Sequence, residues 1–115
     1  MISTMDFTVD KKDNYALIDI QAEKLDSNIA PNLKSELVVL NAEGVKNIIL
    51  NLSNTRYCDS SGLSSILVAN RLCKNAQGKL VLCNLQDGVK KLISISQLDS
   101  ILAVAQTTEE AAGLF

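Results

Sequence analysis

Residues 47–76 constrain the fold of this chain more than any other stretch, because they combine a strand, a polar loop and a long helix. The run Ile48–Leu52 is short, apolar and rich in β-branched residues, which is typical of a strand covered on both faces. A polar loop, residues 51–57, leads to Asp-Ser-Ser-Gly at positions 59–62. From there to Ala76 nothing interrupts a helix, and apolar residues recur at helical spacing. The stretch therefore predicts a central strand followed by a helix that begins at residues 59–62.

The predicted helix has two sides. At about 100° per residue, mostly small and apolar side chains fall on a side that we expect to face the sheet: Gly62, Ser65, Ile66, Ala69, Leu72, Cys73 and Ala76. A stripe on the opposite side spans about 16 Å of helix: Ser60, Ser64, Leu67 and Arg71. This stripe begins with a hydroxyl in the first turn, where the positive dipole end and free N–H groups favour a negative charge. A phosphate on Ser60 is therefore compatible with the fold.

The N-terminal part of the sequence predicts a hairpin and then a helix. Apolar residues alternate with polar ones on either side of a turn at residues 12–14: Met5, Phe7 and Val9, then Ala16, Ile18 and Ile20. Ser27 or Asn28 is expected to cap a helix that has Pro31 in its first turn and ends before Gly44. Four apolar residues should form the inward side of this helix: Ala30, Leu33, Leu37 and Leu40.

The C-terminal part continues the alternation of strands and helices. Three segments are expected to be regular: Leu80–Cys83 as a strand, Val89–Ile95 as a short helix and Ile101–Val104 as a last strand. Thr107 with Glu110 has the pattern of a capping box for a terminal helix. This order indicates an α/β fold. We expect one domain, residues 1–115, with a mixed central sheet opened by the N-terminal hairpin and covered by about four helices.

Composition excludes several classes of function. The net charge of −2, the isoelectric point of about 5.0 and the aromatic content of 3% argue against nucleic-acid binding, because excess cations and stacking rings are both lacking. The sequence contains no histidine, which removes Ser-His-Asp and Cys-His arrangements and the side chain best suited to proton transfer near pH 7. Neither a P-loop nor G-x-G-x-x-G occurs. We therefore expect no catalytic residue and no cofactor.

Cysteine usage suits a reducing compartment, and hydropathy predicts no membrane span. Cys58, Cys73 and Cys83 form no C-x-x-C pair, so neither a disulfide framework nor a metal site is expected. We interpret Cys73 and Cys83 as core residues and Cys58 as partly exposed. Acidic residues interrupt the N-terminus, and no apolar run approaches the roughly 18 residues of a membrane span. The expectation is a cytoplasmic protein that does not bind membranes.

The central stretch resembles the STAS domain family, specifically its bacterial anti-sigma factor antagonists. The similarity covers residues 47–52, Asp59-Ser60-Ser61-Gly62-Leu63, and Ile66, Leu67 and Arg71. It extends to Leu25-Asp26, which is similar to the family's G-E-L-D, and to Val89-Lys90-Lys91-Leu92 with Leu98, which is similar to its V-x-x-L-(x5)-L pattern. The departures are Glu23-Lys24 for glycine-glutamate, Ser64 as the small residue after Gly-Leu, and Gln97 for the glycine before the late leucine.

The resemblance implies a protein that binds an anti-sigma factor, so that a sigma factor is released. The expected partner is a serine kinase, which binds the ATP itself and ends the complex by phosphorylating Ser60. A separate phosphatase that acts on the phosphoserine would restore binding. The resemblance places the partner-binding surface on the central helix and on the acidic loop before the first helix: Asp26, Asn28, Asp59, Ser60, Ser61, Gly62, Ser64, Leu67 and Arg71.

Other interpretations stay open on the sequence. Asp59-Ser60-Ser61 is also a common helix cap, and Leu67 is also explained as an isolated surface leucine. An accessory STAS subunit of a lipid or anion transport system would bind an ATPase or a permease without being phosphorylated, so it has no need of a phosphoacceptor at Ser60. An enzyme with an unrecognised polar cluster is the third possibility, and the absence of histidine weighs against it.

Overall fold

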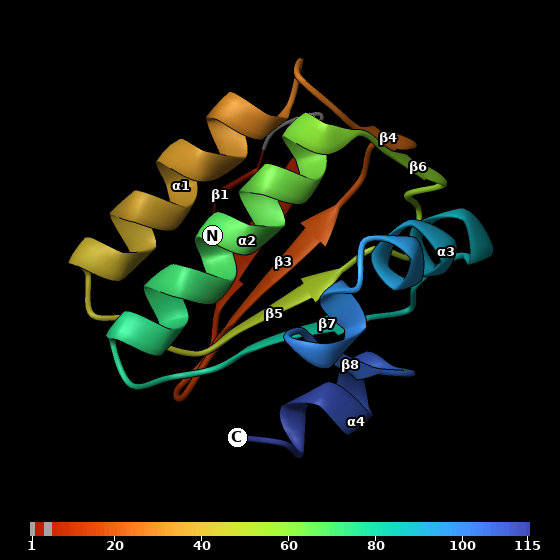
Figure 1. Cartoon of the computed structure of the whole chain (residues 1–115). Coiled ribbons are helices and arrows are strands. Elements are labelled where there is room, and N and C mark those ends of the chain that lie inside the picture. The colour runs from red at the N-terminus through yellow and green to blue at the C-terminus, as the bar shows by residue number, and fades with distance from the viewer. Residues whose placement is uncertain (1, 4–5) are drawn as a thin grey trace.

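The computed structural model describes residues 2–3 and 6–115, and there six strands form one mixed sheet in the order β1-β2-β3-β5-β7-β8 (Figure 1). The strands are β1 (Ile2–Ser3), β2 (Phe7–Lys11), β3 (Ala16–Ile20), β5 (Ile48–Asn51), β7 (Leu80–Cys83) and β8 (Ala103–Ala105). β1, β2 and β3 pair antiparallel, whereas β3, β5, β7 and β8 run parallel. The predicted α/β fold, with a mixed sheet opened by a hairpin, is confirmed.

β2 and β3 are the predicted hairpin. Phe7 lies opposite Ile20 and Val9 lies opposite Ile18, and all four side chains are buried. Met5, which was expected in the first of these strands, lies outside the described residues. The edge strand β1 pairs with β2 and was not predicted, because a strand of two residues has no alternation to detect.

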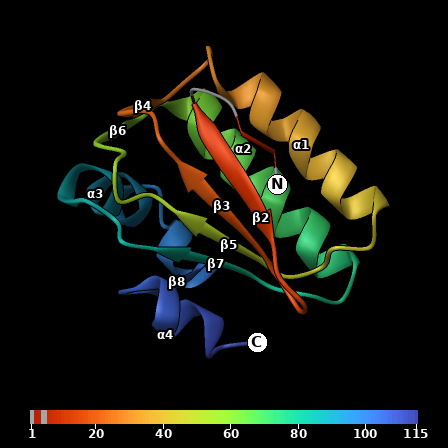
Figure 2. The ribbon, with the colours of Figure 1, turned by 180° about the vertical axis from the view of Figure 1, so that it is seen from behind.

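Helices cover both faces of the sheet. One face carries the larger core cluster, to which three helices contribute: α1 (Ala30–Ala42), α2 (Ser60–Asn75) and α3 (Asp87–Ile95). The opposite face, which is toward the viewer in Figure 2, is covered by α4 (Thr108–Ala112). β5 and β7 lie between these layers, so their side chains are almost all buried, as expected for central strands. None of the helices in the described part of the chain has the length and apolar character needed to cross a membrane.

The start of α1 differs from the prediction. Neither Ser27 nor Asn28 caps the helix, because Ile29 occupies the N-cap position and is 6% exposed. Asp26 takes over the capping contacts: its carbonyl accepts hydrogen bonds from the N–H groups of Ile29 and Ala30 at 3.1 and 2.8 Å. Its carboxylate accepts another from the N–H of Asn28 at 3.0 Å. Burial of Ile29 in the core fixes this turn, so packing overrides the capping signal that the sequence offers.

The inward sides of α1 and α2 are largely as predicted. α1 has Pro31 in its first turn, ends before Gly44 and buries all four expected residues. In α2 most of the expected inward set is buried: Gly62, Ser65, Ile66, Ala69 and Cys73. Leu72 is only half-buried because it lies at the margin of the buried arc, and Ala76 is half-buried because it is the C-cap, beyond the last turn of the helix. Asn70, at the other margin, is 8% exposed and was not predicted to be inward.

The last strand begins later than predicted. After α3 the backbone of Gln97 turns through a φ of 60°, and a 3-10 turn, η1 (Leu98–Ser100), follows. The N–H groups of Ile101 and Leu102 both donate to the carbonyl of Leu98, at 3.0 and 2.9 Å. Ile101 is therefore held in the turn and is 49% exposed, so the predicted strand Ile101–Val104 is replaced by β8, Ala103–Ala105.

The last two helices begin close to the predicted positions. α3 starts at Asp87, ahead of the expected Val89. The Thr107 hydroxyl caps α4 by accepting a hydrogen bond from the N–H of Glu110 at 3.1 Å, as predicted. The Glu110 carboxylate accepts a hydrogen bond from the N–H of Gln106 at 3.4 Å. The predicted capping box required this bond to come from the N–H of Thr107, so that part of the prediction is wrong by one residue.

A second, two-stranded sheet lies at the N-terminal end of α2. β4 (Lys24–Leu25) and β6 (Tyr57–Cys58) pair in parallel, with Lys24 opposite Tyr57 and Leu25 opposite Cys58. Figures 1 and 2 both show this pair of strands beside the first turn of α2. The pairing was not predicted. It joins the segment before α1 to the segment before α2, and so brings two of the predicted site regions together.

Candidate functional site

Asp59 forms the N-cap of α2. Its backbone is extended, and its carboxylate accepts a hydrogen bond from the N–H of Gly62 at 2.9 Å. Its carbonyl accepts the first intrahelical bond, from the N–H of Leu63 at 2.9 Å. The capping role that Asp59-Ser60-Ser61 suggested therefore belongs to Asp59 alone, which leaves both serine hydroxyls for other purposes.

The two serines after the cap differ in accessibility. Ser60 is exposed, as expected for the outward stripe, whereas Ser61 is half-buried. Among the described residues no group accepts a hydrogen bond from the Ser60 hydroxyl. The hydroxyl stands in the first turn of α2, where the dipole and the N–H groups favour an added negative charge. Ser60 thus has the access and the electrostatic setting that a phosphoacceptor requires.

Gly62 holds the start of α2 against the β4–β6 sheet. A Cβ atom at this position would lie 2.1 Å from the Leu25 carbonyl oxygen and 2.8 Å from the Cys58 sulfur. The same Leu25 carbonyl also accepts a hydrogen bond from the N–H of Asp59 at 3.3 Å. The glycine of Asp-Ser-Ser-Gly is therefore needed for close packing, and Gly62 itself is buried beneath the exposed surface.

A pocket of about 200 Å³ lies beside this helix start. Its lining comes from both strands of the small sheet and from the two acidic residues that follow them: Lys24, Leu25, Asp26, Tyr57, Cys58 and Asp59. Asp26 and Asp59, which are far apart in the sequence and which the resemblance assigned to the partner-binding surface, therefore line one pocket. Asn28 is exposed next to them and donates its N–H to the Asp26 carboxylate. Lys24 and Tyr57 were missed, because strands of two residues leave no periodic signal.

The predicted outward stripe of α2 is accessible along its length. Ser60 and Arg71 are exposed, Ser64 is half-buried, and Leu67 is 36% exposed. Together with Asp26, Asn28 and Asp59 they form a surface that runs from the acidic pocket along the helix. This surface offers carboxylates and a hydroxyl at one end and an apolar side chain and a guanidinium further along, which suits contact with another protein.

Comparisons with known proteins identify the family of this chain. A family model described as STAS domain matches residues 6–111. The chain belongs to the STAS domain family. BtrV of Bordetella bronchiseptica, provisionally named an anti-sigma factor antagonist, is 33% identical over 111 residues, which cover 96% of this chain and 95% of BtrV.

Solved structures share the fold of this STAS domain. A protein of Thermotoga maritima, also provisionally named an anti-sigma factor antagonist, superposes with a TM-score of 0.83 at 23% identity and covers 93% of this chain and 92% of its own. The Bacillus cell fate determinant SpoIIAA in its phosphorylated form gives 0.74 at 24% identity, over 93% of this chain and 96% of its own. At these identities the likeness establishes the fold.

One departure of this STAS domain from the family pattern has a backbone consequence. Gln97 stands where the pattern has glycine, and its φ of 60° lies in the left-handed region. Glycine adopts this conformation without steric cost, whereas other residues carry a penalty of roughly 1–2 kcal/mol. In this chain the turn between α3 and η1 is therefore made with a strained backbone at Gln97.

The cysteines of this STAS domain are poor nucleophiles. Burial, helped by the nearby Asp59 carboxylate, raises the pKa of Cys58 to about 11. Burial likewise raises the pKa of Cys73 and of Cys83 to about 11. Cys73 and Cys83 are buried, as predicted, and Cys58 is half-buried beside the pocket. The described residues contain no group of three or more His, Cys, Asp or Glu side chains arranged to hold a metal ion.

Proposed function

We propose that this STAS domain is an anti-sigma factor antagonist, which binds an anti-sigma factor and thereby releases a sigma factor. The relatives support the proposal, above all BtrV, which is similar over nearly the whole of both chains. The observation in the structure that carries it is the exposed hydroxyl of Ser60, which directly follows the cap Asp59 and has no hydrogen-bond partner in the described part of the chain. A transport subunit that is not phosphorylated has no use for that arrangement.

The partner is proposed to be a serine kinase that brings its own ATP. It would contact the acidic pocket and the outward stripe of α2: Asp26, Asn28, Asp59, Ser60, Ser61, Ser64, Leu67 and Arg71, with Gly62 setting the helix position. Asp26 and Asp59 would meet basic groups of the kinase, and the apolar surface of Leu67 would be covered. With these contacts the Ser60 hydroxyl would lie inside the interface, at the end formed by the start of α2.

Phosphorylation of Ser60 is proposed as the switch. A phosphate adds a charge of about −1.5 to −2 at pH 7, which the helix N-terminus offsets by about 0.3–1 kcal/mol, so the fold survives. Within the complex the same charge has to be desolvated against a surface shaped for a hydroxyl, which costs several kcal/mol. Each 1.4 kcal/mol lowers affinity tenfold. A phosphatase that removes the phosphate would restore binding.

The test uses the purified chain and its cognate anti-sigma factor kinase. After incubation with ATP, tandem mass spectrometry should locate the phosphate on Ser60. Ser60→Ala should bind the kinase without being switched off, and Ser60→Asp should bind weakly while keeping a native circular dichroism spectrum. Ser61→Ala is the matched control and should still be phosphorylated. A phosphate on Ser61, or on neither serine, would refute the assignment. In a separate pull-down from the native cell, capture of a permease or transport ATPase in place of a kinase would refute the function.

A further inference from the structure

The pocket beside Ser60 is lined by residues of both charges. Of the described residues that line it, Lys24 is basic, while Asp26 and Asp59 are acidic. Lys24 and Asp26 flank Leu25, which is fully buried, so the alternation of an extended chain directs both charged side chains away from the core. Lys24 therefore shares the outer side of β4 with Asp26 and lies against the residues that precede Ser60.

Lys24 is available for a new contact. It is exposed, and within residues 2–3 and 6–115 it makes no ion pair. The neighbouring cation, Arg56, is already engaged, because its guanidinium lies 3.7 Å from the Glu23 carboxylate and 5.9 Å from the centre of the Tyr57 ring. Among the described residues that line the pocket, Lys24 is thus a basic residue whose charge has no ion-pair partner.

The two carboxylates of the pocket are fixed in place. Asp26 accepts a hydrogen bond from the N–H of Asn28 at 3.0 Å, and Asp59 accepts one from the N–H of Gly62 at 2.9 Å. Neither can turn away from an anion that arrives next to it without losing this bond. The helix N-terminus offers about half an elementary charge, whereas a phosphate brings about 1.5 to 2 negative charges. A cation next to a phosphate at this position would therefore stabilise its dianion further.

We propose that Lys24 is the counter-ion of a phosphate on Ser60: its flexible side chain crosses the pocket and binds the phosphate oxygens. The proposal rests on the phosphorylation of Ser60 proposed above. Lys24 stands at a position where this chain departs from the family pattern, which has glutamate there. A glutamate at this position would add a third carboxylate to the pocket. In the phosphorylated protein Lys24 then lies across the pocket and covers Asp26 and Asp59, so the switch hides the acidic surface as well as adding charge.

The experiment needs no kinase, because phosphoserine is incorporated at position 60 during synthesis of the full chain. ³¹P NMR then follows the second ionisation of the phosphate at low ionic strength. The groups that face it are the carboxylates of Asp26 and Asp59, the Lys24 ammonium and, further off, the paired Arg56 and Glu23. Lys24→Gln should raise the pKa of the phosphate by about 0.5 pH unit, because a cation that favours the dianion is lost.

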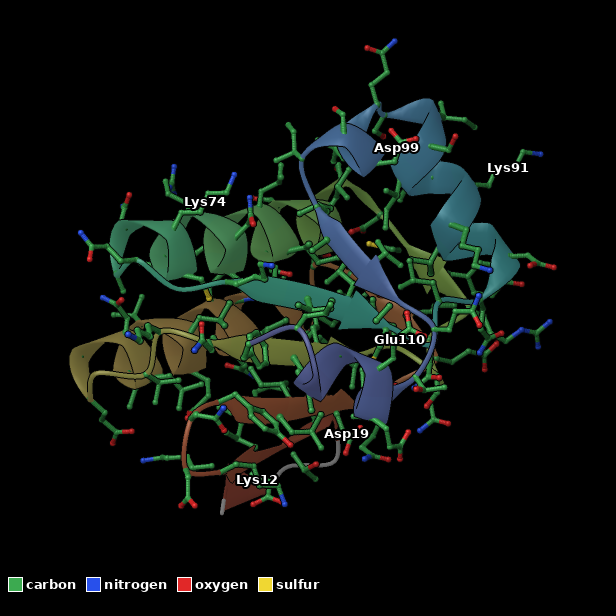
Figure 3. All side chains as sticks on the ribbon, turned by 90° about the horizontal axis from the view of Figure 1, so that it is seen from below. Lys12, Asp19, Lys74, Lys91, Asp99 and Glu110 are labelled. Atoms are coloured by element: carbon green, nitrogen blue, oxygen red, sulfur yellow. The ribbon has the colours of Figure 1, made fainter. Side chains whose placement is uncertain are left out.

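Matched variants make the result specific. Lys24→Arg should keep the wild-type titration, and so should Lys91→Gln, an exposed lysine that points into solvent from α3 (Figure 3). An equal titration of the wild type and Lys24→Gln would overturn the proposed role of Lys24. The proposed function is judged separately, by whether the phosphoserine-containing chain loses its affinity for the kinase; if it binds as tightly as the unmodified chain, the switch is refuted whatever Lys24 does.

Discussion

Replacing Gly62 by alanine tests whether the close approach of α2 to β4 positions the functional surface. The added Cβ would lie 2.1 Å from the Leu25 carbonyl oxygen and 2.8 Å from the Cys58 sulfur. The first of these atoms belongs to the backbone and also accepts the hydrogen bond from the Asp59 N–H. Relief of the clash therefore requires the helix start and β4 to separate, rather than a side chain to rotate.

Two opposing effects decide the magnitude. Alanine is favoured over glycine in a helix by about 1 kcal/mol. Against this, overpacking of a close contact costs about 1–3 kcal/mol, and occasionally more. Because the Cβ has to retreat by more than 1 Å before the contact with Leu25 becomes ordinary, we place Gly62→Ala near the upper end of that range, with a net loss of about 1–2 kcal/mol in the free energy of unfolding.

Urea unfolding followed by circular dichroism measures this loss, and titration with the kinase measures the effect on binding, which should weaken because Asp59 and Ser60 move relative to Asp26. Gly113→Ala is the control: its added Cβ meets no atom closer than 3.4 Å and its φ of −72° suits alanine, so stability should stay equal or rise by about 0.4–1 kcal/mol. If Gly62→Ala is as stable as the wild type and binds equally well, the packing argument is wrong.

Three further predictions concern Leu67, Asp59 and the cysteines. Leu67→Ser should weaken kinase binding with a loss of stability of no more than about 0.5 kcal/mol, whereas a large fall in melting temperature, of the kind expected for the fully buried Ile66, would assign Leu67 to the core. Asp59→Ala should lower the free energy of unfolding by about 1 kcal/mol through loss of the cap, and an unchanged urea midpoint would contradict the capping role. Since burial raises the pKa of Cys58, Cys73 and Cys83 from 9.0 to about 11 in the folded chain, their contribution to stability is complete below pH 9 and is lost as the pH rises through 11; urea midpoints that stay constant over this window would disprove it.

The sequence by itself determined the elements whose signals are local. The apolar run Ile48–Leu52, the segment Asp59–Gly62 and the helical spacing after it predicted β5, the start of α2 and the exposure of Ser60. These features depend on periodicity and on hydrogen bonds between residues close in the chain, so they can be read without knowledge of the rest of the molecule.

Only the tertiary structure decided how distant segments meet. The pairing of β4 with β6 places Asp26 and Lys24 in one pocket with Asp59, and no pattern in either two-residue strand announces it. The same holds for the start of α1, where the burial of Ile29 gives the capping contacts to Asp26 in place of Ser27 or Asn28. In both cases the free energy comes from packing between residues far apart in sequence, a contribution that local propensity does not contain.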